Sequence, residues 1–354
     1  MAIDNFLRTA SLTSLLLTLA TTTDPAAAQA AAQQLPLFLD ESALELTLEA
    51  PLRALRRSAR TREEFDAVLR YRDGAGGPDS LEIEVRVRGN SRLAQCDFPP
   101  LSLDFPRSQL EGTLFEGQNR LKLVTLCKQQ DRYRDYLALE YDIYRLFNRL
   151  TDRSFRVRRA NVNYVSTDSR REESFTEPAF FIEEDWEVAA RHNHELLEIQ
   201  KLALTDLDPD HTALLSVFQY IIANTDWSAL RGPGEEDCCH NGNVFGETGG
   251  GAIVIPYDFD QSGLIDTEYS APSEQLPIRS VTRRYYRGYC ALNPQTETAI
   301  AYILQQRSAL AAVLEDSAAS EDAKEDALEF LNESLDILAD PEERNEEILE
   351  PCRG

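Results

Sequence analysis

Residues 81–87 read Leu-Glu-Ile-Glu-Val-Arg-Val, an alternation of apolar and polar side chains that predicts a half-buried β-strand. A polar turn, Arg88-Gly89-Asn90-Ser91, follows this strand. Farther along, residues 136–150 (YLALEYDIYRLFNRL) carry apolar side chains at helical spacing. Other segments of the first half show strand patterns: residues 44–48, 101–105, 121–126, 157–165 and 179–182. The first half is therefore expected to mix strands with one long helix.

The second half is expected to be mostly helical. Its periodic segments predict helices over residues 196–204, 214–223, 298–314 and 322–338. One short apolar run, residues 252–257, predicts a strand. Together the two halves indicate an α+β protein.

The net charge of the chain limits the classes of partner that it is expected to bind. The 354 residues carry a formal net charge of −25, and 42% of them are apolar. Such a composition supports a sizeable buried core. Nucleic acid is not expected as a partner, because binding it requires Lys and Arg to neutralise phosphates.

Residues 1–30 are typical of a secretory signal. Arg8 supplies positive charge, residues 9–20 are apolar but too short to span a bilayer, and residues 28–30 (Ala-Gln-Ala) offer a cleavage site. No other stretch is long enough for a transmembrane helix. The protein is therefore expected to be exported, to the periplasm or the extracellular space.

Six cysteines in an exported chain favour disulfides. Cys96 and Cys127 lie in the strand-rich half and are expected to pair. Cys290 and Cys352 are expected to pair with Cys238, with Cys239 or with each other. A zinc site built on Cys238-Cys239-His240 is the alternative, although no CxxC spacing accompanies these residues.

The residues most suggestive of chemistry lie between positions 224 and 263. Residues 224–228 (Asn-Thr-Asp-Trp-Ser) precede a polar loop, which leads to residues 240–245 (His-Asn-Gly-Asn-Val-Phe) and then to residues 255–260 (Ile-Pro-Tyr-Asp-Phe-Asp). A carboxylate, an amide and a second carboxylate after a strand are the parts of a phosphoryl-transfer site. The first carboxylate, an aspartate, orients the attacking hydroxyl. The amide and the second carboxylate hold Mg²⁺ against the phosphates.

In these motifs the chain resembles the spore-coat protein H (CotH) kinase family, over roughly residues 81–263. The resemblance implies that Asp226 is the catalytic base and that Asn241 or Asn243 is a metal ligand. It also implies that Asp258 is the main metal carboxylate, assisted by Asp260.

The first half carries further parts of the resemblance. Residues 85–91 (Val-Arg-Val-Arg-Gly-Asn-Ser) resemble the turn that this family places over the nucleotide, so Arg88, Gly89, Asn90 and Ser91 are expected to bind it. Unlike a protein-kinase glycine-rich loop, this turn has a single glycine. Lys122 in a strand and Glu140 in the next helix match the kinase pair that positions phosphates, with Lys128 as the alternative lysine.

The resemblance implies a two-lobed, atypical protein-kinase-like fold with a strand-rich N-lobe and a helical C-lobe. Residues 1–30 would be the signal peptide, 31–80 a lead with one strand, 81–188 the N-lobe and 189–354 the C-lobe. The implied activity is transfer of the ATP γ-phosphoryl group to a protein hydroxyl with Mg²⁺ or Mn²⁺. Two alternatives stay open: a non-catalytic envelope or surface binding protein on a kinase-like scaffold, and a purely structural cation site.

Overall fold

The computed structural model describes residues 35–72, 80–90, 92–170, 173–234, 236–247 and 250–354. The expected signal peptide, residues 1–30, and Ser91 of the expected nucleotide turn lie outside these ranges. Residues Leu35–Gly354 form one compact unit.

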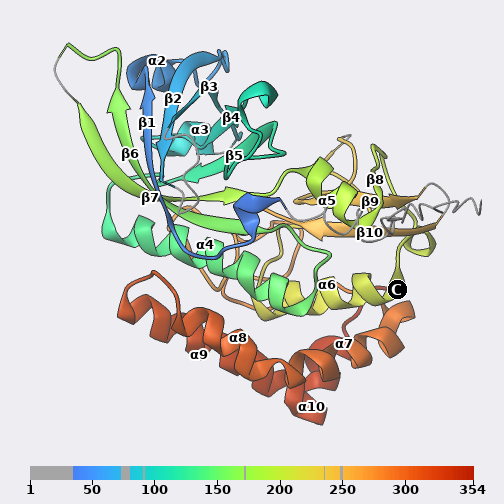
Figure 1. Ribbon diagram of the computed structural model, residues 1–354. Coiled ribbons are helices and arrows are strands. Elements are labelled where there is room, and N and C mark those ends of the chain that lie inside the picture. Colours follow the sequence, from blue (N-terminus) through green and yellow to red (C-terminus); the bar gives the residue numbers. More distant parts are fainter. Residues whose placement is uncertain (1–34, 73–79, 91, 171–172, 235, 248–249) are drawn as a thin grey trace, which may run out of the picture. The chain divides into compact units, whose positions relative to one another are not determined.

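Seven strands close into a barrel in the order β1-β2-β3-β4-β5-β7-β6 (Figure 1). Neighbouring strands are antiparallel except β1 and β6, which are parallel, with Leu48 opposite Tyr164. Closure removes the unpaired strand edges that an open sheet would expose. The bounds are β1 Leu44–Ala50, β2 Phe65–Tyr71, β3 Ser80–Val87, β4 Leu101–Asp104, β5 Arg120–Thr125, β6 Val157–Ser166 and β7 Ser174–Ile182.

The barrel interior explains the alternation in the sequence. Leu81, Ile83 and Val85 of β3 are buried in the same apolar cluster as Leu48 and Phe181, which come from other strands. The intervening glutamates of β3 are exposed. The predicted strand at residues 81–87 is therefore confirmed, with its apolar face turned into the barrel.

The expected two-lobed kinase-like fold is wrong. The strand of the supposed N-terminal lead, β1, pairs with β6, and β2 joins β1 to β3. These pairings close the sheet into a mixed barrel, so the strands do not form an open lobe that ends near residue 188. The predicted boundaries between a lead, an N-lobe and a C-lobe stay a prediction.

Most helices pack outside the barrel around a second apolar cluster, whereas α2 buries Leu52 and Leu55 in the barrel cluster. Helix α4 contacts β6 and β7 as well as α8, while α6 contacts α7 and α9, so α4 lies between the barrel and the C-terminal helices (Figure 1). The helix bounds are α2 Leu52–Arg57, α3 Arg92–Gln95, α4 Asp131–Leu150, α5 Asp185–His192, α6 Pro209–Ile221, α7 Asn293–Gln305, α8 Arg307–Glu315, α9 Glu321–Ala339 and α10 Pro341–Arg344. Single short turns occur at η1 Pro36–Phe38, η2 Arg107–Gln109, η3 Leu204–Asp206, η4 Cys290–Leu292 and the π-helical η5 Asn345–Leu349.

A small second sheet lies beside α6. It contains β8 Glu195–Leu196, β9 Gly242–Glu247 and β10 Gly250–Pro256 in the order β10-β9-β8. The helix predicted over residues 196–204 is wrong, because this segment pairs with the sheet and the loop beside it. Leu196 lies opposite Phe245, and Ile199 forms a bridge with Cys238. The helix predicted over residues 298–314 divides into α7 and α8, with a break at Gln306.

Three disulfides are present: Cys96–Cys127, Cys238–Cys239 and Cys290–Cys352. The first confirms the expected pair, and the third is one of the pairings left open for Cys290 and Cys352. Cys238 and Cys239 are bonded to each other, so neither offers a thiolate for the alternative zinc site. Within the described ranges, no helix is both long and apolar enough to cross a membrane.

Candidate functional site

A cavity of about 240 Å³ brings together residues that lie far apart in the sequence. It is enclosed by the turn after β3, by β5, by α4, by the start of α5 and by the ends of β9 and β10. Seven residues of the predicted site line it: Arg88, Gly89, Asn90, Lys122, Glu140, Asn243 and Asp258. Three others, Asp226, Asn241 and Asp260, do not line it.

The turn after β3 forms one rim of the cavity. Gly89 adopts a φ of +88°, a conformation that glycine reaches without steric cost. Arg62 donates hydrogen bonds to the Gly89 carbonyl at 2.9 Å and to the Asn90 side chain at 2.6 Å. The guanidinium of Arg62, which lies outside the turn, therefore helps to fix the conformation of a turn that has a single glycine.

A single arginine occupies the carboxylate side of the cavity. Arg92, the first residue of α3, lies 2.7 Å from Glu140, 3.5 Å from Asp258 and 3.1 Å from Asp260. Only 13% of its side chain is exposed. Tyr269 also donates a hydrogen bond to Asp260, at 3.2 Å.

The expected pairing of Lys122 with Glu140 does not form. The ammonium of Lys122 lies 2.9 Å from Asp185 and 3.8 Å from Glu184, at the start of α5. Asn243 donates to the same Asp185 oxygen at 2.7 Å. Glu140 instead pairs with Arg92, because both are directed to the carboxylate side of the cavity. The alternative lysine, Lys128, lines a different cavity and pairs with Glu268.

Asp226 belongs to a separate polar group that follows α6. Its Oδ1 lies 2.6 Å from Nε2 of His240, and its Oδ2 accepts a hydrogen bond from Asn241 at 2.9 Å. Asn241 also donates to the Asp226 backbone carbonyl at 2.7 Å. Asn241 therefore bonds to Asp226, whereas Asn243 lines the cavity together with Asp258.

Burial and these contacts shift pKa values in both polar groups. Burial would raise the pKa of Asp226, but the hydrogen bonds from His240 and Asn241 outweigh burial and lower it. The hydrogen bond to Asp226 raises the pKa of His240. In the cavity, burial is the main cause that raises the pKa of Asp258 and Glu140, and Arg92 opposes the rise. Asp258 is half-buried, and 43% of its side chain is open to solvent.

The cavity supplies hard oxygen donors of the type that Mg²⁺ or Mn²⁺ prefers, from Asn243, Asp258 and Glu140. Arg92 engages the carboxylates of Glu140 and Asp258, and Asn243 bonds to Asp185 through its amide nitrogen. Among the residues that the structure describes, no three His, Cys, Asp or Glu side chains are grouped to hold a metal ion. The donor chemistry therefore fits a divalent cation, whereas the arrangement requires Arg92 to move away from the carboxylates.

Two residues of the site were missed by the sequence analysis. Arg92 follows directly after the quoted turn, and Asp185 follows the apolar end of β7 after Glu183 and Glu184. A charged residue at the end of an apolar strand is the signal that could have identified Asp185. Arg92 carried no such signal, because its role depends on carboxylates almost 50 and 170 positions farther along the chain.

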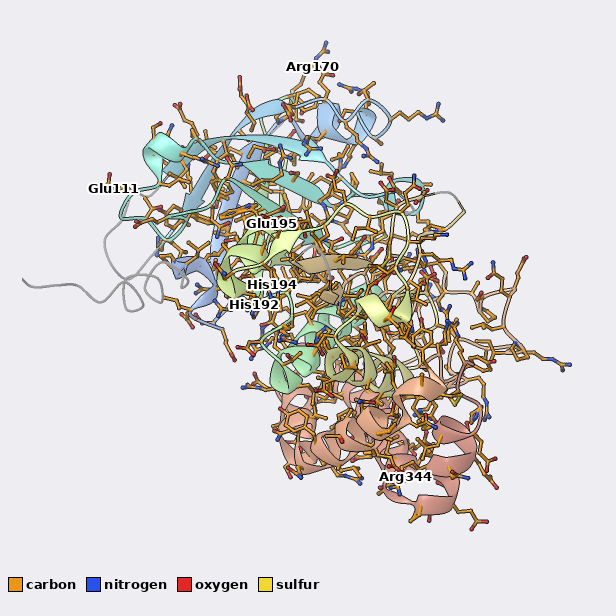
Figure 2. All side chains as sticks on the ribbon, turned by 90° about the vertical axis from the view of Figure 1, so that its right-hand side faces the viewer. Glu111, Arg170, His192, His194, Glu195 and Arg344 are labelled. Carbon is orange, nitrogen blue, oxygen red and sulfur yellow. A yellow bond between two sulfur atoms is a disulfide. The ribbon has the colours of Figure 1, made fainter. Side chains whose placement is uncertain are left out.

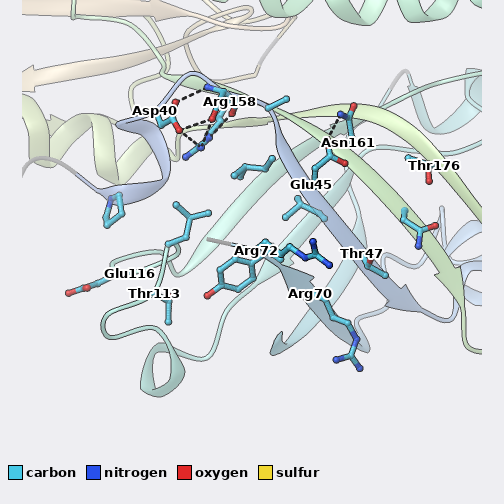
Figure 3. A pocket seen from close by; sticks show the side chains of 18 of the residues that line it. Asp40, Glu45, Thr47, Arg70, Arg72, Thr113, Glu116, Arg158, Asn161 and Thr176 are labelled. Atoms are coloured by element: carbon cyan, nitrogen blue, oxygen red, sulfur yellow. Dashed lines mark hydrogen bonds and ion pairs between the residues drawn. The ribbon is translucent and has the colours of Figure 1, made fainter. Parts of the chain in front are cut away.

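Two other features lie away from this site. A larger cavity of about 1140 Å³ opens at the barrel, with Arg158 bonded to Asp40 and Asn161 bonded to Glu45 on its wall (Figure 3). His192 and His194 lie beside each other near Glu195 (Figure 2), with ring centroids 6.1 Å apart. None of these residues lines the smaller cavity, and the larger cavity holds no residue of the predicted site.

No protein-family model matches the chain, and a comparison with curated proteins finds no significant match.

Proposed function

We propose that this protein binds ATP with Mg²⁺ or Mn²⁺ and transfers the γ-phosphoryl group to a protein hydroxyl, as the resemblance to CotH-like kinases implies. One observation carries the proposal. Seven residues chosen from the sequence for this chemistry, at positions between 88 and 258, line one cavity of about 240 Å³. The proposal rests on the site and does not depend on a kinase-like fold.

The cationic residues and the oxygen donors of the cavity would have different roles. Of the three cations that line it, Arg92 pairs with carboxylates, whereas Lys122 and Arg88 can meet phosphates. A compact ammonium serves as a point charge for phosphate. Asn243 and Asp258 would hold the divalent ion, which would neutralise negative charge on the phosphates. Asp226 would orient the acceptor hydroxyl, and His240 holds its carboxylate in place.

We also propose that the protein works after export, in the periplasm or outside the cell. Three disulfides support this compartment, because disulfides persist in oxidising surroundings.

A second candidate function is binding without turnover, as an envelope or surface protein. It is favoured by the contacts of Arg92, which engages Asp258 and Asp260, the carboxylates that metal would need.

Thermal unfolding of the full, oxidised chain tests these functions. A ligand that binds only the native state raises stability by mass action. We expect Mn²⁺ and ATP together to raise the melting temperature more than the sum of their separate effects. The shift should disappear in Asp258→Asn, which keeps the positive φ of +59° that Asn tolerates.

The matched control is Asp322→Asn, an exposed carboxylate on α9, which should leave the shift unchanged. A shift with metal alone would favour a structural cation site. No shift with any combination would contradict the phosphotransferase proposal and favour the non-catalytic function.

A further inference from the structure

The carboxylates around Arg92 can carry more negative charge than this one guanidinium balances. Glu140, Asp258 and Asp260 would carry three negative charges when ionised, against one positive charge on the guanidinium. The remaining two charges equal those of one divalent cation. Among the contacts of the described residues, the only other group bonded to these carboxylate oxygens is the hydroxyl of Tyr269.

Ion pairs, a disulfide and the packing of Leu93 against the apolar cluster of the barrel set the position of Arg92. Helix α3 is a single turn, Arg92–Gln95, and none of its residues is buried. The residue after it, Cys96, is bonded to Cys127 just beyond β5. The backbone N–H groups of residues 97 and 98 both point to the carbonyl of Cys127, at 2.9 and 3.4 Å. The disulfide and these two hydrogen bonds therefore anchor the turn that presents Arg92 to the cavity.

We propose that Arg92 is an internal competitor for the divalent cation: it occupies the carboxylates while the metal is absent and must withdraw when the metal binds. The Cys96–Cys127 disulfide holds α3 in place and so sets the strength of this competition. The inference rests on the proposed metal site and adds its regulation. It accounts for carboxylates that meet at one guanidinium and yet, among the described residues, do not form a group able to hold a metal ion.

Binding of Mn²⁺ alone to the full, oxidised chain tests the competition, with free Mn²⁺ followed by electron paramagnetic resonance. The variants are Arg92→Gln and Arg149→Gln. Both remove one positive charge, but Arg92 touches the carboxylates, whereas Arg149 is exposed on α4 and lies outside this cavity. A buried charge contact of this kind exceeds 1.4 kcal/mol, so we expect Arg92→Gln to bind Mn²⁺ about tenfold more tightly or better. Arg149→Gln should change the affinity by less than about threefold, since its charge is open to solvent and screened by salt.

The disulfide has its own test. Replacing Cys96 and Cys127 together by Ser should also tighten Mn²⁺ binding, by less than Arg92→Gln does, because the loosened turn presents Arg92 less often. If Arg92→Gln does not fold, Arg92→Lys should still tighten binding, because Lys cannot reproduce the forked contacts of Arg.

The outcomes separate this inference from the proposed function. Equal Mn²⁺ affinity in the wild type and Arg92→Gln, or weaker binding in the variant, would overturn the competition and leave the metal site standing. No Mn²⁺ binding in any variant would overturn both.

Discussion

Protonation of His211 is expected to destabilise the protein in mild acid. His211 lies in the first turn of α6 and is 4% exposed. Its Nε2 lies 3.0 Å from the carbonyl of Val254 on β10, so the neutral ring links α6 to the strand that leads to Asp258. Burial is the main cause that lowers its pKa from 6.5 to about 4.

The size of the effect follows from this difference. Below pH 6.5 the unfolded chain takes up a proton at this histidine, but the folded protein does not do so until about pH 4. The contribution to the free energy of unfolding is therefore complete above pH 6.5 and is lost as the pH falls toward 4. At 1.36 kcal/mol per pKa unit, the total loss is about 3 kcal/mol, of which about 2 kcal/mol is lost by pH 5.

Urea unfolding of the oxidised wild type and of His211→Gln, between pH 7.5 and 4.5, measures this loss. Glutamine can still donate to the Val254 carbonyl but does not titrate. The difference in unfolding free energy between the two proteins cancels the other titrating groups, and it should shift toward the variant by about 2 kcal/mol by pH 5. A difference that does not change with pH would refute the assignment of a buried neutral His211.

Two further predictions concern a disulfide and the polar pair beside α6. Replacing Cys290 and Cys352 by Ser opens a loop with a sequence separation of 62, and the chain-entropy relation gives a loss of about 4 kcal/mol in unfolding free energy. Chemical denaturation measures it, and a loss below about 1 kcal/mol would contradict that relation here. Asp226→Asn should lower the pKa of His240, because it removes the carboxylate that raises that pKa. Titration of the imidazole by NMR checks this, and an unchanged value would show that the pair does not form in solution.

The elements with strong local periodicity were predicted well from the sequence. The strand at 81–87 and the helix at 136–150 both appear, as β3 and the C-terminal three-quarters of α4. Strand β2 was missed, and α5 was missed as well. Helix α5 is short and carries no clear periodicity, whereas β2 has an alternation of Phe65, Ala67, Leu69 and Tyr71 from which it could have been predicted.

The membership of the candidate site could also be predicted in large part. Polar residues that interrupt or follow apolar strands have few structural reasons to be there, so Lys122, Asn243 and Asp258 stood out and meet in one cavity. Their partners could not be predicted. Arg92 lies beside Glu140, where Lys122 had been expected, and Lys122 pairs with Asp185 instead.

The amino-acid sequence by itself determined the local elements, the acidic surface charge and the set of residues that can do chemistry. Each of these depends on neighbours within a few positions or on composition alone. Only the tertiary structure decided that the strands close into a barrel and that one arginine occupies the carboxylates. Both depend on contacts across long stretches of chain, such as Leu48 opposite Tyr164 and Arg92 beside Asp260. Such contacts are selected by the packing of the whole core, and no local pattern of residues specifies them.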